Sequence, residues 1–392
     1  MTEPPSSLPY KTRFALTHGG PADRALSRMG LITPLVKRIV LFFGVGWLPL
    51  LILSAFEGVA IGNAVKIPFL FDIGEQIRLL LVVPLLLAAE PLIGPTLREA
   101  VEQFPRENLI SADEFPVFQS AIHQAMRLKE SVLAEILLIG LVIVADIAHL
   151  DAIHMAFAST WLYSPSATGP IRSLAGWWLA FVSLSAYRFL LFRWFWRFFI
   201  WARFLWQVSR LRLQLIPTHP DRAGGLAFLG DAQLRFTVII FCGSAVIAST
   251  LANLILYGGQ SPFEFKTPIF VYIFLVICLV LFPLFTFTPK LIALKEKGQL
   301  EYGSLSMSYS RLFDQTWIQD IAQKTTLLGS EDIQSLAAMD VSFRMVKGMN
   351  IVPFDFETIK VLVLAALLPF LPLLLSIIPV QEAWDKLRMF LL

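Results

Sequence analysis

Charge is scarce in this sequence. Asp, Glu, Lys and Arg make up 16% of the 392 residues, and 56% of the residues are hydrophobic. Soluble domains usually carry about 25% charged residues and few long apolar runs. The shortage of charge argues against a chain of soluble domains and favours a polytopic membrane protein.

Cysteine and the common cofactor motifs are also rare or missing. The two cysteines, Cys242 and Cys278, both fall inside apolar runs, which predicts packed thiols and neither a disulfide nor a metal pair. The chain has no P-loop, GxGxxG or CxxC motif and no complete zinc or Ser/His/Asp set. We therefore assign no catalytic residue and no cofactor. The net charge of +3 is too small to indicate a nucleic-acid partner.

Apolar runs long enough to cross a bilayer recur along the chain. A transmembrane helix needs about 20 predominantly apolar residues. Runs of about this length lie at 39–56, 79–97, 132–150, 174–198, 236–257, 268–288 and 361–380. We therefore expect an all-α fold, a transmembrane helical bundle of about seven spans. The 79–97 run is the least regular, because Glu90, Pro91, Gly94 and Pro95 interrupt it and make its helix prone to a kink or break.

Lysine and arginine are distributed unevenly between the connections. They gather in residues 1–35 and in the long connections 98–130, 199–235 and 290–360, whereas the short connections hold few. Because cytoplasmic loops carry the excess of Lys and Arg, we expect a cytoplasmic N-terminus and an outer C-terminus, in a cell inner or plasma membrane. Residues 1–35 are expected to be partly disordered, and 36–392 to form the membrane domain.

The long connections are expected to form a cytoplasmic layer of short amphipathic helices. Residues 290–360 predict two or three such helices against the inner face of the bundle, where a cytoplasmic protein partner would bind. The basic inner face is expected to contact the bilayer and its anionic headgroups. Whether the chain forms a homo-oligomer is left open.

The second half of the fourth span is rich in arginine and aromatic residues. Arg188, Arg193, Arg197, Arg203 and Arg210 lie among Trp and Phe residues in a run longer than one bilayer needs. The pattern predicts one continuous helix that leaves the membrane and continues at the inner interface. The arginines are interpreted either as an interfacial anchor whose side chains reach the headgroups or as a gating or anion-binding set.

Ionisable residues inside a span are the first place to look for function, because charge in lipid is unfavourable without a partner or water. In the third span, Glu135, Asp146 and His149 lie within roughly 60° of one another on a helix. This face is expected to point into the protein. One interpretation is a wetted polar helix end, and another is a proton or ion pathway.

The outer end of the third span carries two further polar residues. Asp146 and His149, and likewise Asp151 and His154, have the spacing of two ligands on one helical face. His149, Asp151 and His154 are therefore weak candidates for a metal site, which would need more ligands from another helix.

Glu90 in the second span and Arg188 in the fourth have similar depths by helical rise. An uncompensated charge at this depth is unfavourable. We therefore predict that these two side chains form an ion pair, which either locks the bundle or serves as a gate or coupling carboxylate.

The connection 217–230 reads PTHPDRAGGLAFLG and joins the fourth span to the fifth. Its prolines end one helix and its glycines give the backbone freedom, which predicts a helix–turn–helix junction. A functional alternative uses unpaired backbone N–H groups at a helix start to hold phosphate or a lipid headgroup. The anion-binding candidates are His219, Asp221, Arg222, Gly224 and Gly225.

Three classes of function stay open. The leading hypothesis is a transport protein, a channel or secondary carrier for an ion or small solute. Its pathway candidates are Glu90, Glu135, Asp146, His149 and Arg188. The alternative is a non-transport scaffold, sensor or assembly factor with a cytoplasmic partner surface. The third and least favoured is a lipid-acting enzyme that uses the 217–230 connection.

Overall fold

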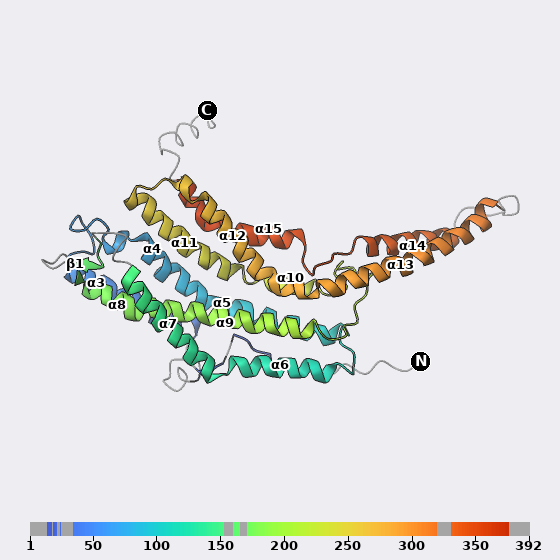
Figure 1. Cartoon of the computed structure of the whole chain (residues 1–392), viewed down its shortest axis with the longest axis horizontal. Coiled ribbons are helices and arrows are strands. Elements are labelled where there is room, and N and C mark those ends of the chain that lie inside the picture. The colour runs from blue at the N-terminus through green and yellow to red at the C-terminus, as the bar shows by residue number, and fades with distance from the viewer. Residues whose placement is uncertain are drawn as a thin grey trace, which may run out of the picture.

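The computed structural model of the chain describes residues 14–17, 19–21, 24, 34–152, 160–164, 171–319 and 331–375. These residues form an elongated bundle of helices with one short hairpin of strands (Figure 1). Six helices are long and apolar enough to cross a membrane, and a seventh is added if a bent pair counts as one span. The all-α bundle is thereby confirmed, and the chain is a multi-pass membrane protein by the length and composition of its helices.

The first two spans each contain a π-helical stretch. Their segments are α2 (Leu35–Phe42), η1 (Phe43–Trp47) and α3 (Leu48–Phe56), then η2 (Phe69–Phe71), α4 (Ile73–Gln76), η3 (Ile77–Val82) and α5 (Val83–Arg106). Pro91 and Pro95 lie inside α5, which runs through them as one helix. Of the kink or break expected here, the break does not occur.

The third and fourth spans lie side by side. α6 (Phe115–Lys129) meets α7 (Val132–Ala152) at a bend of 45°. The strands β1 (Tyr163–Ser164) and β2 (Ile171–Arg172) pair antiparallel and lead into α8 (Leu174–Trp178), η5 (Leu179–Ser183) and α9 (Leu184–Val208). The last three run as one helix of 35 residues, which confirms the continuous helix predicted from the arginine-rich run.

The remaining helices complete the bundle and add an arm to it. They are α10 (Phe228–Leu234), α11 (Thr237–Gly258), η6 (Pro262–Phe265), α12 (Lys266–Leu281), η7 (Phe282–Phe287), α13 (Thr288–Phe313), η8 (Asp314–Gln319), α14 (Glu331–Lys347), α15 (Phe356–Leu367), η10 (Leu368–Phe370) and α16 (Leu371–Leu375). The helix from Pro262 to Ile318 is continuous over 57 residues.

The 290–360 connection differs from the short helices expected there. α13 and α14 pack on each other and project from the bundle as a long helical hairpin (Figure 1). We call these two helices the arm. The reason is visible in the sequence, because no proline interrupts the chain between Pro289 and Pro353. We call this end of the molecule the hairpin end, and the opposite end, which carries β1, β2 and the start of α8, the sheet end.

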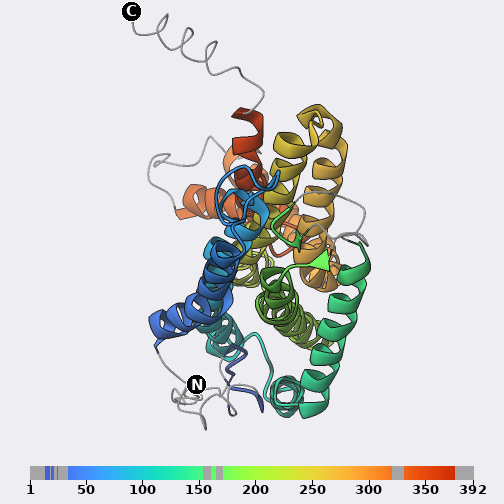
Figure 2. The ribbon, with the colours of Figure 1, turned by 90° about the vertical axis from the view of Figure 1, so that its left-hand side faces the viewer.

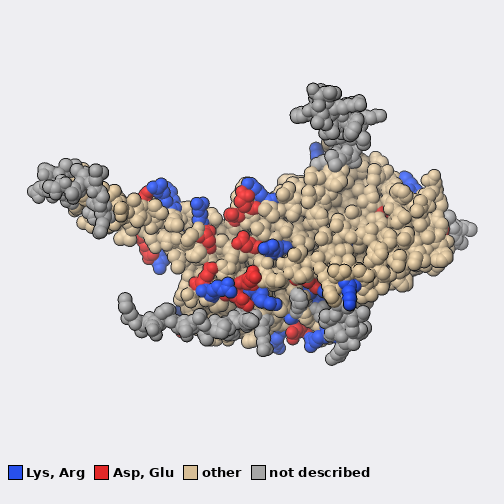
Figure 3. Space-filling view, turned by 180° about the vertical axis from the view of Figure 1, so that it is seen from behind, with Lys and Arg blue, Asp and Glu red and all other residues tan. Residues whose placement is uncertain are grey.

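Charged side chains gather toward the hairpin end. Figure 3 shows Lys, Arg, Asp and Glu concentrated over that half of one face, whereas the half toward the sheet end is mostly bare of charge. An apolar surface of this kind is what a lipid environment requires.

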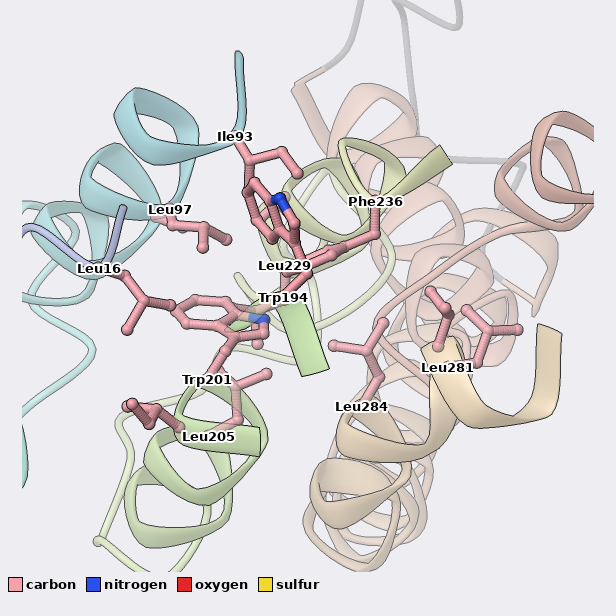
Figure 4. Packing of buried hydrophobic residues seen from close by; sticks show 14 of the residues in the cluster. Leu16, Ile93, Leu97, Trp194, Trp201, Leu205, Leu229, Phe236, Leu281 and Leu284 are labelled. Carbon is pink, nitrogen blue, oxygen red and sulfur yellow. The ribbon is translucent and has the colours of Figure 1, made fainter. Parts of the chain in front are cut away.

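The helix α9 lies at the centre of the bundle. Viewed from the sheet end, α7 flanks it on one side and the Leu35–Phe56 helix lies on the other (Figure 2). Its buried face contributes Trp194, Trp201 and Leu205 to a large apolar core shared with α5, α10 and α11 (Figure 4). This core fixes α9 against α5, and the ionisable side chains of both helices are positioned by that packing.

Candidate functional site

Glu90 lies inside the bundle and is surrounded by arginines. Its side chain is 6% exposed, and its two oxygens lie 2.7 Å from Arg38 Nη1, 2.8 Å from Arg197 Nη2 and 3.8 Å from Arg193 Nη1. The four residues come from α2, α5 and α9. We call them the Glu90 cluster. One carboxylate thus ties three helices together through charge-assisted hydrogen bonds.

The predicted ion pair between Glu90 and Arg188 is wrong. Arg188 Nη1 instead pairs with Asp146 Oδ1 on α7, and Ser185 Oγ donates to the other oxygen of Asp146 at 2.6 Å. Arg188 and Arg193 point about 140° apart around α9 at 100° per residue. The depth predicted from helical rise is wrong as well, because Arg193 and Arg197 lie level with Glu90, whereas Arg188 follows Tyr187, whose ring lies against Arg78.

Beyond Arg188, the first two arginines of α9 are buried and the one that follows them is exposed. Arg193 is 7% exposed and Arg197 is 3% exposed, so neither reaches outward as the interfacial-anchor interpretation requires. Arg203 and Arg210 are exposed, and the Arg210 guanidinium lies 3.9 Å from the centre of the Trp206 ring. The interfacial interpretation therefore fits only the part of α9 nearest the hairpin end.

A second cluster of buried polar residues lies toward the sheet end. Asp72 caps the start of α4 by accepting from the Glu75 backbone N–H at 3.2 Å. The same carboxylate accepts from Asn253 Nδ2 at 2.8 Å and from Trp161 Nε1 at 2.9 Å. α4, α11 and the segment before β1 are therefore joined by one buried aspartate.

Glu75 and Arg78 form the ionic part of this second group. Glu75 Oε1 pairs with Arg78 Nη1, and the Arg78 guanidinium lies 5.6 Å from the centre of the Tyr187 ring. Arg188 is close enough for its charge to act on Glu75 as well as on its own partner. We call Asp72, Glu75, Arg78, Tyr187, Arg188, Asp146 and Asn253 the Glu75 cluster.

Three polar atoms in the Glu75 cluster are buried without a hydrogen-bond partner among the described residues. They are Glu75 Oε2, Arg78 Nε and Asn253 Oδ1. An unpaired buried polar atom is unfavourable by about 1–3 kcal/mol, so native proteins place water, an ion or a functional group at such positions. Their gathering in one place marks the Glu75 cluster as the candidate functional site.

The backbone around this cluster is also unusual. The π-helical stretch η1 contacts both of the other π-helical stretches in these spans, η3 and η5. Ser183 Oγ on η5 donates to the Gly46 carbonyl on η1 at 2.6 Å. π-Helical turns inside α-helices are uncommon and often occur at functional sites.

The sequence argument missed Asp72, Glu75 and Arg78. It began the second span at residue 79, because Arg78 was counted as a residue of a short outer connection. The spacing of three between these residues was the available signal, since it places them along one side of a helix that starts earlier. Helix α4 does start there, at Ile73.

The structure describes only part of the polar face that was predicted for the third span. Asp146 is 7% exposed and faces α9, and Glu135 is half-buried near Arg193 and Gly20. His154 lies outside the described residues, as do the side chains of His149 and Asp151. Among the described residues, no group of His, Cys, Asp and Glu is arranged to hold a metal ion. Cys242 is a buried free thiol as predicted, whereas Cys278 is a free thiol exposed on the surface of its span, so the prediction of a packed thiol is wrong for Cys278.

The 217–230 connection forms a compact turn around Asp221. Its carboxylate accepts the backbone N–H groups of Ala223 at 2.8 Å, Gly225 at 3.1 Å and Ala227 at 3.0 Å. His219 Nδ1 lies 2.7 Å from the same carboxylate. The sequence argument offered backbone N–H groups of this connection as donors to an external anion. In the structure, the Asp221 carboxylate accepts the hydrogen bonds of these N–H groups instead.

The same turn joins the arm to the bundle. Arg222 and Gly224 both have positive φ, 57° and 66°, and the Arg222 carbonyl accepts from the Asn350 N–H at 2.7 Å. A Cβ on Gly224 would come within 3.0 Å of Leu294 on α13. Burial alone would raise the pKa of Asp221, but the hydrogen bonds from Ala227, Ala223 and Gly225 outweigh it and lower the pKa.

No family model, curated protein or solved structure matches this chain.

Proposed function

We propose that the protein is an ion-coupled secondary carrier in which Glu75 is the carboxylate that binds and releases a proton or cation. The observation that carries the proposal is the Oε2 atom of Glu75, which is buried beside Arg78; within the part of the chain that the structure describes, neither this oxygen nor Arg78 Nε has a hydrogen-bond partner. A carboxylate held in this way gains a partner when a proton or a cation reaches it.

Arg188 supplies the coupling in this proposal. It pairs with Asp146 on α7 and also acts electrostatically on Glu75. When Glu75 is neutralised, its attraction for Arg188 and Arg78 is lost, which favours the pairing of Arg188 with Asp146. Binding at Glu75 would in this way alter the contact between α7 and α9, and the adjoining π-helical stretches would absorb the shift.

A carrier fits the distribution of polar groups better than an open channel does. Along α5, the residues between Arg78 and Glu90 that face the core are apolar and buried, among them Val83 and Leu86. Trp194 of α9 packs there and donates its Nε1 to the Leu86 carbonyl at 2.9 Å. This apolar layer separates the two ionic clusters, so an ion would pass only after a conformational change.

We further propose that the hairpin end faces the cytoplasm of a cell whose inner or plasma membrane holds the bundle. The excess of Lys and Arg in the connections of that end supports this orientation. The N-terminus would then be cytoplasmic and the C-terminus outside.

The test is flux across reconstituted liposomes. Purified protein is placed in vesicles that contain a pH-sensitive dye, and gradients of protons, sodium, potassium, chloride and phosphate are imposed in turn. We expect at least one gradient to drive proton movement above the rate of protein-free vesicles. Equal rates with and without protein under every gradient would contradict a carrier that couples these ions to proton movement.

A second candidate function is favoured by the arm. Leu300 on α13 is 76% exposed, Leu312 is 61% exposed and Val341 on α14 is 53% exposed. Apolar side chains on a hairpin that leaves the bundle are typical of a surface that binds another protein. We propose that a soluble helical partner packs on this arm, which a pull-down with wild type and Leu312→Glu would test. Equal capture by both would contradict it.

A further inference from the structure

A cavity of about 630 Å³ lies between α5, α10, α11 and α15. Its volume falls within the range of ligand-binding sites, about 300–1,000 Å³. Its wall includes Glu99, Asp231 and Arg235 together with apolar side chains. None of the described residues that line it belongs to the Glu75 cluster or the Glu90 cluster, so the cavity is separate from both.

The cavity crosses the boundary between the apolar and the charged parts of two spans. On α5, Leu92 lies inside the apolar run 79–97 and Glu99 lies just beyond its end. On the neighbouring span, Val238 lies inside the run 236–257 and Arg235 directly precedes it. Because α5 runs toward the hairpin end and α11 runs away from it (Figure 1), both helices place the polar part of the cavity on the same side. A change from apolar to charged residues marks the level at which a span passes from hydrocarbon to headgroups.

The three charged side chains of the cavity are exposed, and within the residues that the structure describes none of them forms an ion pair. Asp231 and Arg235 are four residues apart, a spacing at which opposite charges usually pair on a helix. The backbone gives the reason, because the Arg235 N–H donates to the Ala232 carbonyl, three residues back, at 3.3 Å. The helix tightens between the two side chains and turns them relative to each other. Both charges are therefore available to a bound molecule.

The order of these groups along the cavity matches the order of groups in a zwitterionic lipid. In phosphatidylethanolamine the acyl chains are followed by the phosphate and then by the ammonium. Along the span, Val238 lies deepest, Arg235 comes next, and Asp231 lies about 6 Å further out by helical rise. Guanidinium donors match the oxygens of a phosphate, and carboxylates accept the N–H groups of a primary ammonium.

We propose that this cavity binds phosphatidylethanolamine, with the lipid phosphate on Arg235 and its ammonium between Glu99 and Asp231. A quaternary ammonium, as in phosphatidylcholine, has no N–H to donate and is typically held by a cage of aromatic rings. Of the described residues that line the cavity, only Phe228 is aromatic, which favours the primary ammonium. This proposal does not depend on ion movement at Glu75.

The experiment compares the affinity of the full-length protein for three lipids with identical acyl chains. Purified protein in detergent is titrated with phosphatidylethanolamine, phosphatidylcholine or phosphatidylglycerol, and native mass spectrometry gives the dissociation constant of the first bound lipid. We expect phosphatidylethanolamine to bind about tenfold more tightly than either of the others, because each of those lacks the hydrogen bonds from a primary ammonium to the carboxylates. Equal affinity for phosphatidylethanolamine and phosphatidylcholine would overturn the proposal.

Charge variants separate the two ends of the headgroup. Arg235→Gln should weaken phosphatidylethanolamine and phosphatidylcholine to the same extent, since both carry the phosphate. Glu99→Gln combined with Asp231→Asn should weaken phosphatidylethanolamine alone and abolish the preference for it. Arg311→Gln and Glu301→Gln, at exposed positions on the arm, are the matched controls. A preference that persists in the doubly neutralised variant would contradict the role of the carboxylates.

A pair of tryptophan variants on α15 tests whether the lipid lies in this cavity. Val361 lines the cavity and is 44% exposed, whereas Leu364, 63% exposed on the same helix, is not part of its wall. Val361→Trp should weaken the binding of phosphatidylethanolamine several-fold because it fills the apolar part of the cavity. Leu364→Trp should leave it unchanged. Equal affinity of the two variants would place the lipid elsewhere on the bundle and overturn the proposal.

Glycerophosphoethanolamine, which has the same headgroup and no acyl chains, distinguishes a lipid from a soluble zwitterion. We expect it to displace phosphatidylethanolamine only at a large excess, because it gains nothing from the apolar part of the cavity. Displacement at equal concentration would overturn the assignment to a lipid. Thermal unfolding without added lipid, measured for every variant, shows whether a lost affinity reflects the site or a failure to fold.

Discussion

Arg197 Nη2 lies 2.8 Å from Glu90 Oε1, in an ion pair whose side chains are 4% and 6% exposed. The pair joins the two central helices, α5 and α9, and Arg197 Nη2 also donates to the Thr17 carbonyl. Removing one partner of a buried pair leaves the other charge without compensation. Because Glu90 compensates the charge of three arginines, its loss is expected to destabilise the folded bundle more than the loss of one ordinary ion pair.

Glu90→Gln should destabilise the folded protein strongly. Three arginines lose their shared carboxylate, and breaking a buried pair is unfavourable by about 3–5 kcal/mol. The measurement is thermal unfolding in detergent. Glu357→Gln is the matched control, because Glu357 forms an exposed pair with Lys360, and such pairs contribute about 0–1 kcal/mol. Equal shifts in the two variants would show that the Glu90 pairs contribute little.

The Arg188–Asp146 pair should be energetically coupled. Each partner is largely buried, at 14% and 8% exposure, so Arg188→Gln and Asp146→Asn are each expected to destabilise the contact between α7 and α9. The double variant should lose less than the sum of the two, by about 0.5–3 kcal/mol. Chemical unfolding of all four proteins in detergent gives the coupling. Strict additivity would mean that the two side chains act independently.

The Asp221 turn should be sensitive to acid. Because its hydrogen bonds lower the pKa of Asp221 in the folded state, the carboxylate stabilises the turn at pH values above the ordinary carboxyl pKa. That contribution is lost as the pH falls through the lowered pKa. Hydrogen exchange at Ala223, Gly225 and Ala227 should therefore accelerate on acidification relative to the intrinsic rate. Asp221→Asn should show fast exchange already at neutral pH, and slow exchange in that variant would contradict the role of the carboxylate.

The two ends of the bundle should be labelled from opposite sides of the membrane. Ser310 on the arm and Gln260 near the sheet end are both exposed, so each is changed to cysteine on a Cys278→Ser background. With the hairpin end cytoplasmic, an impermeant maleimide should label Gln260→Cys in intact cells and Ser310→Cys only in inverted vesicles. The reverse pattern would overturn the proposed orientation.

Much of the fold followed from hydropathy alone. Over the residues that the structure describes, the seven predicted apolar runs each fall on a helix, and the arginine-rich run forms the continuous helix expected of it, because the composition of a span is set by the lipid around it. The arm was predicted less well. Its helices continue past the bundle because no proline interrupts residues 290–352, whereas hydropathy marks only where the apolar part stops.

The candidate site was only partly predictable. Glu90 stood out as a charge in an apolar run, but its partners depend on which side of α9 packs on α5, and one sequence does not fix that rotation. Glu75 was missed because it lies near the start of a helix, where a charge looks like part of a connection. The burial of residues 14–17 was missed because so short a segment carries no periodic pattern.

Proton flux in Glu75→Gln, measured beside wild type and Glu264→Gln in sealed liposomes, tests the role of Glu75 in transport most directly. Glu264 is an exposed carboxylate near the sheet end. We expect its neutralisation to leave the stability of the bundle unchanged. Glu75→Gln keeps the shape of the side chain and removes its charge. We predict that proton movement under the driving gradient falls to the level of protein-free vesicles in Glu75→Gln and stays at the wild-type rate in Glu264→Gln. A wild-type rate in folded Glu75→Gln would contradict the assignment of Glu75 as the coupling carboxylate.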